Sequence, residues 1–239
     1  MLTVTVPAAP GETALPREQR LRRFLNAYWL RPENAMWMAM RSEVLSSVAL
    51  AGPGADLCCG DGLFSFLHAG GVLDPSFDVF THGVNANAGK ESAPDMFDHV
   101  SDQYRPGIVR PPLTRMEVGC DWKENLLAKA RRLDFYSRTV RHNANEPLPF
   151  PDAAFASLYC NSAYWIENID GFLGEIARVL QPGGRAVLHV KLDSMRDCTL
   201  ERFEGALGRK FLDAIAGDRL RCWPTLASPW PRMPTAPCG

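Results

Sequence analysis

The chain has 239 residues, with 26 Lys and Arg against 27 Asp and Glu, so its formal net charge is −1. Hydrophobic residues make up 46% and charged residues 22%. These values are typical of a globular protein with a core, and they exclude a disordered or fibrous chain. The balanced charge argues against a general nucleic-acid binder, which needs a clear basic excess. At roughly 100–200 residues per domain, the length predicts one large domain with decorations.

The sequence contains no sign of a membrane span or a secretory signal. No apolar run reaches about 18 residues, and the N-terminus lacks a basic segment followed by an apolar one. The seven cysteines include no C-x-x-C pair, which favours reduced thiols and offers no zinc spacing. We therefore expect a cytoplasmic protein without a metal site.

The N-terminal part predicts an arm followed by two helices. Residues 1–16 hold three prolines and little pattern, which predicts a mobile arm. Apolar residues recur with helical spacing from Arg17 to Tyr28, and a second helical pattern follows Pro32. The apolar stripe of this second helix consists of Trp37, Met40, Val44 and Val48. We expect these helices, within residues 17–50, to cover an edge of a sheet.

A strand, a glycine-rich turn and a helix follow. The run Ala55–Cys59 predicts a buried strand, Gly60-Asp61-Gly62 the turn, and Leu63 the start of the helix. Residues 72–115 are different, because they carry prolines and scattered aromatic residues without a sustained period. They predict an irregular insertion or lid.

Regular alternation then resumes. Strands are predicted at residues 116–120, 138–142, 155–160 and 184–190, and helices at 122–133 and 170–180. The second of these helices ends at Gln181-Pro182-Gly183-Gly184, and the strand after it is predicted to be fully buried. Strands that alternate with helices predict an α/β fold with a doubly wound, Rossmann-like, mainly parallel sheet.

The C-terminal part lacks a strand pattern. A helix is predicted near residues 199–215, and residues 217–239 form an irregular tail with five prolines. With no sixth or seventh strand, the C-terminal strand pair of the fold is missing. The strand at 184–190 is then a sheet edge that must be covered, by the tail or by the second subunit of a homodimer.

Two glycines and an acid predict a nucleoside pocket. In an open parallel sheet, ligands bind outside the carboxyl ends of the strands. Gly60 and Gly62 follow the first strand and let the backbone approach a ligand closely. Asp121, at the end of the next strand, can accept hydrogen bonds from both hydroxyls of a ribose. Ser65 replaces the third glycine of the dinucleotide fingerprint, so this fingerprint of a nucleotide-dependent oxidoreductase is incomplete.

The same residues carry a family resemblance. ADLCCGDGLFSF resembles motif I of class I S-adenosylmethionine-dependent methyltransferases. The segments VGCDWKENLLAKARRL, HNANEPLPFPDAAF and IARVLQPGGRAVL extend the resemblance in the same order, over about residues 54–192. Within the superfamily it is similar to the small-molecule, type 11-like branch. The resemblance implies a methyltransferase domain within residues 17–216, S-adenosylmethionine as the cofactor and a small-molecule acceptor.

The resemblance also implies a set of cofactor-binding residues. They are Asp56, Gly60 and Gly62 on the methionine and ribose side, Asp121 at the ribose diol, Asn143 and Ala144 at the adenine, and Asn161 near the sulfonium.

No catalytic residue is singled out. The methyl on a sulfonium is already activated, so catalysis can rest on alignment of the acceptor. A general base is needed only if the acceptor must lose a proton early. Candidates after predicted strands are His142, His189, Tyr164, Trp165 and Glu167. Arg31 is a candidate partner for the methionine carboxylate, although a surface position at a helix end is the favoured explanation.

Departures from the family pattern support a second interpretation. Cys58 stands in place of the first glycine of motif I, and Asn143 and Ala156 stand in place of aspartates. Cys58, Ala156 and the missing C-terminal strands favour a degenerate member that binds the cofactor without turnover and serves as a partner or scaffold. The intact Gly60, Gly62 and Asp121 favour an enzyme. No motif indicates the acceptor.

Overall fold

The computed structural model describes residues 16–82 and 104–190. The chain divides into two compact units, Met1–Val190 and Lys191–Gly239, and all described residues belong to the first. The predicted helix near residues 199–215 and the proline-rich tail at 217–239 lie outside the described residues, as does the predicted N-terminal arm up to residue 15.

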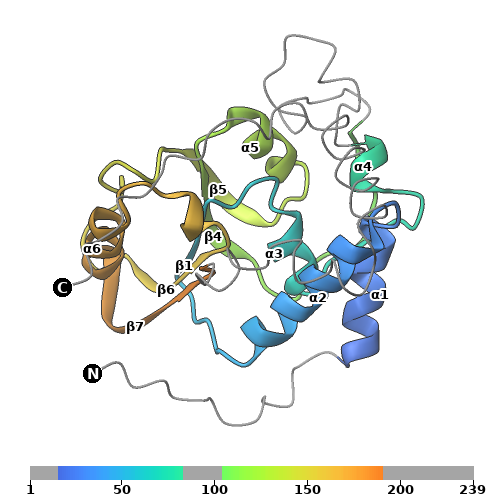
Figure 1. Cartoon of the computed structure of the whole chain (residues 1–239), viewed down its shortest axis with the longest axis horizontal. Coiled ribbons are helices and arrows are strands. Elements are labelled where there is room, and N and C mark those ends of the chain that lie inside the picture. Colours follow the sequence, from blue (N-terminus) through green and yellow to red (C-terminus); the bar gives the residue numbers. More distant parts are fainter. Residues whose placement is uncertain (1–15, 83–103, 191–239) are drawn as a thin grey trace, which may run out of the picture. The chain divides into compact units, whose positions relative to one another are not determined.

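A five-stranded parallel sheet forms the centre of the first unit. The strands, in spatial order, are β5 (Tyr136–Arg141), β4 (Met116–Asp121), β1 (Gly54–Leu57), β6 (Phe155–Cys160) and β7 (Leu180–Leu188). The chain winds from β1 to β4 and β5, then crosses back to β6 and β7 on the other side of β1 (Figure 1). The predicted doubly wound, Rossmann-like α/β fold is confirmed.

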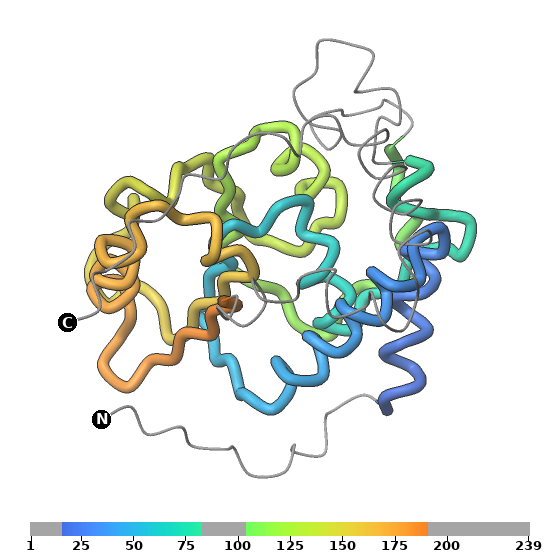
Figure 2. The backbone as a smooth tube through the Cα atoms, viewed as in Figure 1, coloured from blue at the N-terminus to red at the C-terminus, as the bar shows by residue number. Residues whose placement is uncertain are grey.

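Helices cover both faces of this sheet. They are α1 (Arg17–Ala27), α2 (Pro32–Ser46), α3 (Leu63–His68), α5 (Glu124–Arg131), the short 3₁₀ helix η1 (Ala163–Trp165) and α6 (Ile169–Val179). One apolar cluster joins α1, α2, α3 and α5 to the sheet, and a second joins α6 to β1, β4 and β6. Figure 2 shows α6 on one side of the sheet and α1 and α2 on the other. None of the described helices is long and apolar enough to cross a membrane.

The predicted inner face of α2 is wrong. Trp37, Met40 and Val44 are 58%, 50% and 68% exposed. The helix instead buries a face of small residues with one leucine, which consists of Ala35, Ala39, Ser42 and Leu45. Small side chains let helices approach each other closely, and α2 packs against α1 along this face. Hydrophobic spacing alone does not show which of two apolar faces is buried.

The ends of the predicted irregular insertion contain regular structure. β2 (Val72–Leu73) pairs antiparallel with β3 (Ile108–Arg110), and α4 (Val79–His82) lies between them in the chain. Asp78 accepts the backbone N–H of Leu30 at 3.0 Å, and Tyr104 is fully buried in the core. The insertion is therefore not irregular throughout. β2 and β3 were not predicted because strands this short leave no detectable period in the sequence. Residues 83–103 lie outside the described residues.

The strand β7 differs from its prediction. It begins at Leu180, directly after α6, and its residues are exposed or half-buried rather than fully buried. Phe155 of β6 faces Leu180, whereas Ser157 faces Arg185, so the residues between them on β7 form a bulge. The exposure follows from position, since β7 is the last strand of the sheet in the described part of the chain. The other predicted strands and helices that are described lie within two residues of their predicted bounds.

Candidate functional site

The candidate site lies at the carboxyl ends of β1, β4 and β6, beside the point where the strand order reverses. The turn from β1 to α3 curls over these ends. Three of its residues have a left-handed backbone: Cys58 at φ 56°, Gly60 at φ 59° and Gly62 at φ 72°. The N–H of Cys59 donates to the carbonyl of Cys120 at 2.9 Å, which joins the turn to the end of β4.

Asp121 provides a second link between this turn and β4. Its Oδ2 accepts the N–H of Gly60 at 2.9 Å, and its Oδ1 accepts the N–H of Lys123 at 2.9 Å. The N–H of Trp122 also hydrogen-bonds this carboxylate, and since the two oxygens can accept about four hydrogen bonds in all, these contacts do not use every lone pair. The residue is 7% exposed, and burial raises the pKa of its carboxyl.

The two predicted glycines have different surroundings. A Cβ on Gly60 would meet no heavy atom within 4 Å, so the space beside it is open. A Cβ on Gly62 would lie 2.9 Å from Cε2 of Tyr136 and 3.3 Å from Cβ of Ala130. Gly60 therefore borders space that a ligand can enter, whereas protein packing itself requires a glycine at position 62.

Asp56 lies on β1, just before the turn. The residue is 1% exposed, and its Oδ2 accepts hydrogen bonds from Ser65 Oγ at 2.5 Å and Tyr136 Oη at 2.6 Å. Its buried Oδ1 has no hydrogen-bond partner in the described part of the chain. Burial, with a contribution from Asp121, raises the pKa of this carboxyl to about 6. The unpartnered oxygen is an acceptor that suits a ligand with a hydrogen-bond donor.

Asn143 and Ala144 begin the loop that joins β5 to β6. The N–H of His142 donates to the backbone carbonyl of Asp121 at 3.0 Å, so the loop starts beside the candidate ribose site. The side-chain oxygen of Asn143 accepts hydrogen bonds from the backbone N–H and side-chain amide of Asn145, at 3.1 and 3.2 Å. Ala144 packs against the apolar cluster on the α6 face. Both residues therefore lie near Asp121, and Asn143 Oδ1 already makes local contacts.

Asn161 is the meeting point of three elements. It follows β6, and its Oδ1 lies 3.4 Å from Nη1 of Arg41 on α2 and 3.1 Å from Nδ1 of His189 after β7. The ring of Tyr164 packs edge-on against His189, with centroids 5.9 Å apart. A polar cluster of Arg41, Asn161 and His189 thus lies at the end of β6.

The turn is the acidic side of the site. Burial raises the pKa of Asp61, as it does for Asp56 and Asp121, and the Asp121 carboxylate adds to the effect at Asp61 and Asp56. The buried Lys129 opposes it at Asp61. Grouped carboxylates favour a positively charged ligand nearby, since opposite charges attract strongly where water is excluded. In residues 16–82 and 104–190, no group of three or more His, Cys, Asp or Glu side chains is arranged to hold a metal ion.

The thiols near the turn are free, and Cys120 and Cys160 are buried while Cys58 and Cys59 are half-buried. Cys58, Cys59, Cys120 and Cys160 form no disulfide. A side-chain hydrogen bond with Cys160, together with burial, raises the pKa of Cys58, and burial raises the pKa of Cys120 to about 12. Thiolates are the reactive form of cysteine, so neither side chain is a nucleophile at neutral pH.

The candidate bases are spread over the site's border. His142 Nε2 is 3.3 Å from the carbonyl of Glu146, and His189 contacts Asn161 through its side chain. Tyr164 and Trp165 pack against each other in η1, with centroids 5.4 Å apart.

The two charged candidates have local partners. The backbone N–H of Glu167 donates to Oδ1 of Asn145 at 2.9 Å. The guanidinium of Arg31 lies over the ring of Phe80 at 5.3 Å, and its Nη1 is 3.9 Å from Glu33. His189 thus contacts a predicted site residue, whereas Arg31 packs on the inserted α4.

Sequence reasoning missed three residues of this region. Arg41 lies beside Asn161, and Ser65 and Tyr136 both donate to Asp56. Arg41 was detectable as a charge within the apolar sequence of α2, and Ser65 as the residue in place of a third glycine. Tyr136 gives no local signal, because its contact with Asp56 joins positions far apart in the chain.

One comparison with known proteins finds a family match over part of this chain. Residues 106–188 match the family model described as a methyltransferase domain. The matched stretch runs from the start of the β3 region to the end of β7 and contains Asp121, Asn143, Ala144 and Asn161. The predicted resemblance to type 11-like, S-adenosylmethionine-dependent methyltransferases is confirmed over this stretch.

The solved structures that this chain matches include two methyltransferases. A SAM-dependent methyltransferase from Thermotoga maritima is 12% identical, with a TM-score of 0.43, over 80% of this chain and 72% of that one. An S-adenosylmethionine-dependent methyltransferase from Mesorhizobium loti is 19% identical, with a TM-score of 0.37, over 64% of this chain and 52% of that one. The alignment thus spans about half of the Mesorhizobium protein. A search of curated proteins finds no match.

Proposed function

We propose that this protein is an S-adenosylmethionine-dependent methyltransferase that acts on a small molecule. The match of residues 106–188 to a methyltransferase domain supports the reaction class. The observation that carries the proposal is the open space beside Gly60, bordered by the carboxylate of Asp121. Backbone without a side chain, next to a carboxylate with free lone pairs, suits a ribose with two hydroxyls.

The residues of the site fit the cofactor. Asp121 would accept the ribose hydroxyls, and the loop at Asn143 and Ala144 would contact the adenine. The unpartnered Oδ1 of Asp56 and the acidic turn suit the positive charges of the methionine part. Asn161, at the end of β6, would lie near the sulfonium.

The chain's remaining task is to align the acceptor. When bound, the cofactor supplies an activated methyl group. An acceptor atom placed in line with that methyl needs little further help, because orientation lowers the barrier. The polar cluster of Arg41, Asn161 and His189 lies where an acceptor would approach. His189 is the candidate base for an acceptor that must lose a proton.

Calorimetric titration tests the cofactor. We expect S-adenosylhomocysteine to bind and NADH not to bind, because the third glycine of the dinucleotide fingerprint is missing. Preference for NADH would make the protein a nucleotide-dependent oxidoreductase. Transfer of label from methyl-labelled S-adenosylmethionine to a panel of small-molecule acceptors then tests the reaction.

A binding protein without turnover is the second candidate. Cys58 favours it, because a side chain holds a left-handed position of the turn at φ 56°. Tight binding of S-adenosylhomocysteine without label transfer to any acceptor class would support this second function and contradict the first.

A further inference from the structure

The connection from β5 to β6 crosses the sheet without a helix. Parallel strands are usually joined through a helix, which satisfies its own backbone hydrogen bonds. Residues 142–154 form a loop instead, and Leu148 and Phe150 of this loop are buried. Buried backbone N–H and C=O groups need partners. The loop must therefore obtain its partners from elsewhere.

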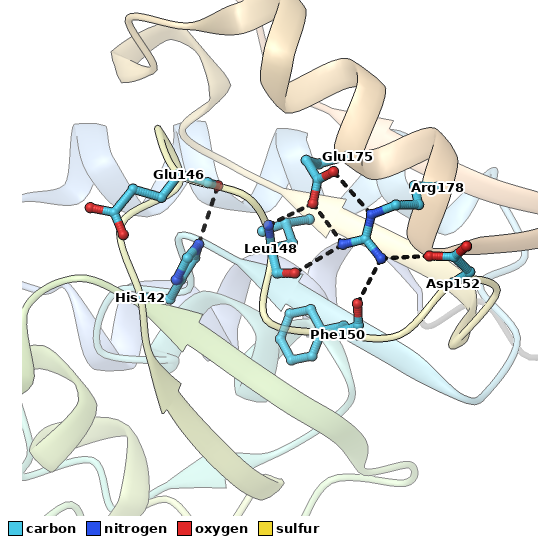
Figure 3. Close-up of polar contacts among 7 residues, drawn as sticks. All are labelled: His142, Glu146, Leu148, Phe150, Asp152, Glu175 and Arg178. Atoms are coloured by element: carbon cyan, nitrogen blue, oxygen red, sulfur yellow. Dashed lines mark hydrogen bonds and ion pairs between the residues drawn. The ribbon is translucent and has the colours of Figure 1, made fainter.

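Arg178 of α6 supplies them. Its Nη2 donates to the carbonyl of Leu148 at 2.9 Å, and its Nη1 donates to the carbonyl of Phe150 at 2.8 Å and to Asp152 Oδ1 at 2.8 Å (Figure 3). Its Nε and Nη2 also donate to the two oxygens of Glu175, at 2.9 and 2.6 Å. A guanidinium has five N–H donors, and all five are used here.

Glu175 completes the arrangement from the other side. While paired with Arg178, its Oε2 accepts the N–H of Leu148 at 2.7 Å (Figure 3). The two side chains therefore bind both backbone groups of Leu148. In addition, the N–H of Ala153 in the loop donates to the backbone carbonyl of Arg178 at 2.9 Å. The loop is fixed to one turn of α6 through its own main chain.

The other end of the loop lies in the candidate site. The N–H of His142 donates to the carbonyl of Asp121, and His142 Nε2 lies 3.3 Å from the carbonyl of Glu146. Asn145 joins the loop to the start of α6, because its Oδ1 accepts the N–H groups of Glu167 and Asn168 at 2.9 and 3.1 Å. Asn143 and Ala144 are thus held between Asp121 and α6.

From this geometry we propose that Arg178 and Glu175 are positioning residues for the cofactor. They fix the loop at Leu148 and Phe150 and thereby hold Asn143 and Ala144 beside Asp121. The consequence for the cofactor rests on the proposed function, whereas the consequence for the loop does not. Neither residue is proposed to touch the cofactor or the acceptor.

Arg178→Lys is the informative substitution. An ammonium is a point donor without the planar fork, so it cannot reach two carbonyls and two carboxylates at once. The variant keeps the charge and most of the aliphatic side chain. Asp152→Asn is the matched control, because it weakens one contact to a side chain that is 80% exposed and leaves both carbonyl contacts intact. Glu175→Gln serves as a milder second variant if the lysine variant does not fold.

Hydrogen exchange of the ligand-free protein gives the first readout. In Arg178→Lys, the amides of Asn145, Glu146 and Leu148 should exchange at least tenfold faster, while those of β6 keep their protection. Asp152→Asn should change neither group. Equal exchange of the loop amides in the parent and the variant overturns the proposal, as does a uniform increase over the whole sheet.

Calorimetry with S-adenosylhomocysteine gives the second readout. Well below the melting temperature, Arg178→Lys should weaken binding about tenfold, and Asp152→Asn less than twofold. A purely structural role lowers the melting temperature and leaves the affinity unchanged, which overturns the proposal. If the parent itself does not bind S-adenosylhomocysteine, the proposed function fails, and the exchange experiment alone decides the role of Arg178.

Discussion

The carboxylate of Asp121 accepts the backbone N–H of Gly60 at an N···O distance of 2.9 Å, although 61 positions separate the two residues in the chain. This contact makes the glycine turn and the end of β4 one unit. A change in the side chain of Asp121 therefore alters the turn as well as any direct contact with a ligand.

Asp121→Ala should weaken the binding of S-adenosylhomocysteine at least about tenfold. A hydrogen bond to a charged group is worth about 1.5–3 kcal/mol, and 1.4 kcal/mol is a factor of ten in affinity. Asp121→Ser should lose as much affinity, because serine cannot bind two hydroxyls as an anion. Serine can still accept the N–H of Lys123, so this variant keeps that contact of the turn. Calorimetric titration of both variants is the measurement.

The control for Asp121 is Glu18→Ala, which removes an exposed ion pair with Arg22 on α1. It should leave the affinity unchanged. If Asp121→Ser binds as tightly as the parent, Asp121 only orders the turn before α5, and the ribose assignment is wrong.

Gly60→Ala and Gly62→Ala should fail in different ways. A residue other than glycine with a left-handed backbone lowers the free energy of unfolding by roughly 1–2 kcal/mol, and this loss applies to both variants. Alanine at position 62 would also collide with Tyr136, so its free energy of unfolding should fall by about 3 kcal/mol. Alanine at position 60 meets no protein atom but enters the space proposed for the ligand. Urea unfolding should rank Gly62→Ala as less stable, and calorimetry should show the loss of affinity in Gly60→Ala.

Asp56→Asn should remove part of the pH dependence of stability. Burial raises the pKa of Asp56 from 3.8 to about 6, so between these values the native state keeps a proton that the unfolded chain releases. The parent therefore loses stability as the pH rises through this range. A pKa shift of this size corresponds to a loss of about 3 kcal/mol in the free energy of unfolding.

Asparagine cannot ionise, and it retains an oxygen that can accept hydrogen bonds from Ser65 and Tyr136. The free energy of unfolding of Asp56→Asn should therefore rise by about 3 kcal/mol relative to the parent between about pH 4 and about pH 7. Denaturant titrations across this range give the comparison. A difference that does not change with pH would mean that Asp56 titrates normally.

Cys58→Gly should be more stable than Cys58→Ala by about 1 kcal/mol. Glycine is ordinarily the worse residue in regular structure by about 0.5–1 kcal/mol, but alanine at φ 56° is strained. Thermal unfolding of the two variants measures the difference. Ala55→Gly in β1 is the control and should destabilise. If alanine were more stable than glycine at position 58 as well as at position 55, the backbone of Cys58 would not be strained in solution.

The parts of the fold that were predictable are those with local patterns. β6 was predicted at its observed bounds, and the turn was found because Gly60 and Gly62 follow an apolar run. Asp121 was located for the same reason, since it ends a strand and precedes a helix. These features depend on neighbours in the sequence.

Contacts between distant positions were not predictable. Arg41 and Asn161 are 120 positions apart, and no spacing rule connects them. Arg178 binds the loop at Leu148 and Phe150 through their carbonyl groups, and main-chain acceptors are the same at every residue, so the sequence contains no matching pattern. The buried face of α2 was assigned wrongly because large exposed residues have the stronger hydrophobic signal.

The pairing of β2 with β3 makes the chain between them a suitable place to insert a foreign domain. The N–H of Asp74 donates to the carbonyl of Gly107 at 2.7 Å, so the chain leaves and returns at neighbouring points. With the two ends held by the fold, each doubling of the intervening length adds only about 0.6 kcal/mol of closure entropy. Because Val79 of α4 and Tyr104 belong to the packed part, the graft between β2 and β3 must leave both in place. A fluorescent reporter inserted there would leave the parallel sheet and the carboxyl ends of its strands intact.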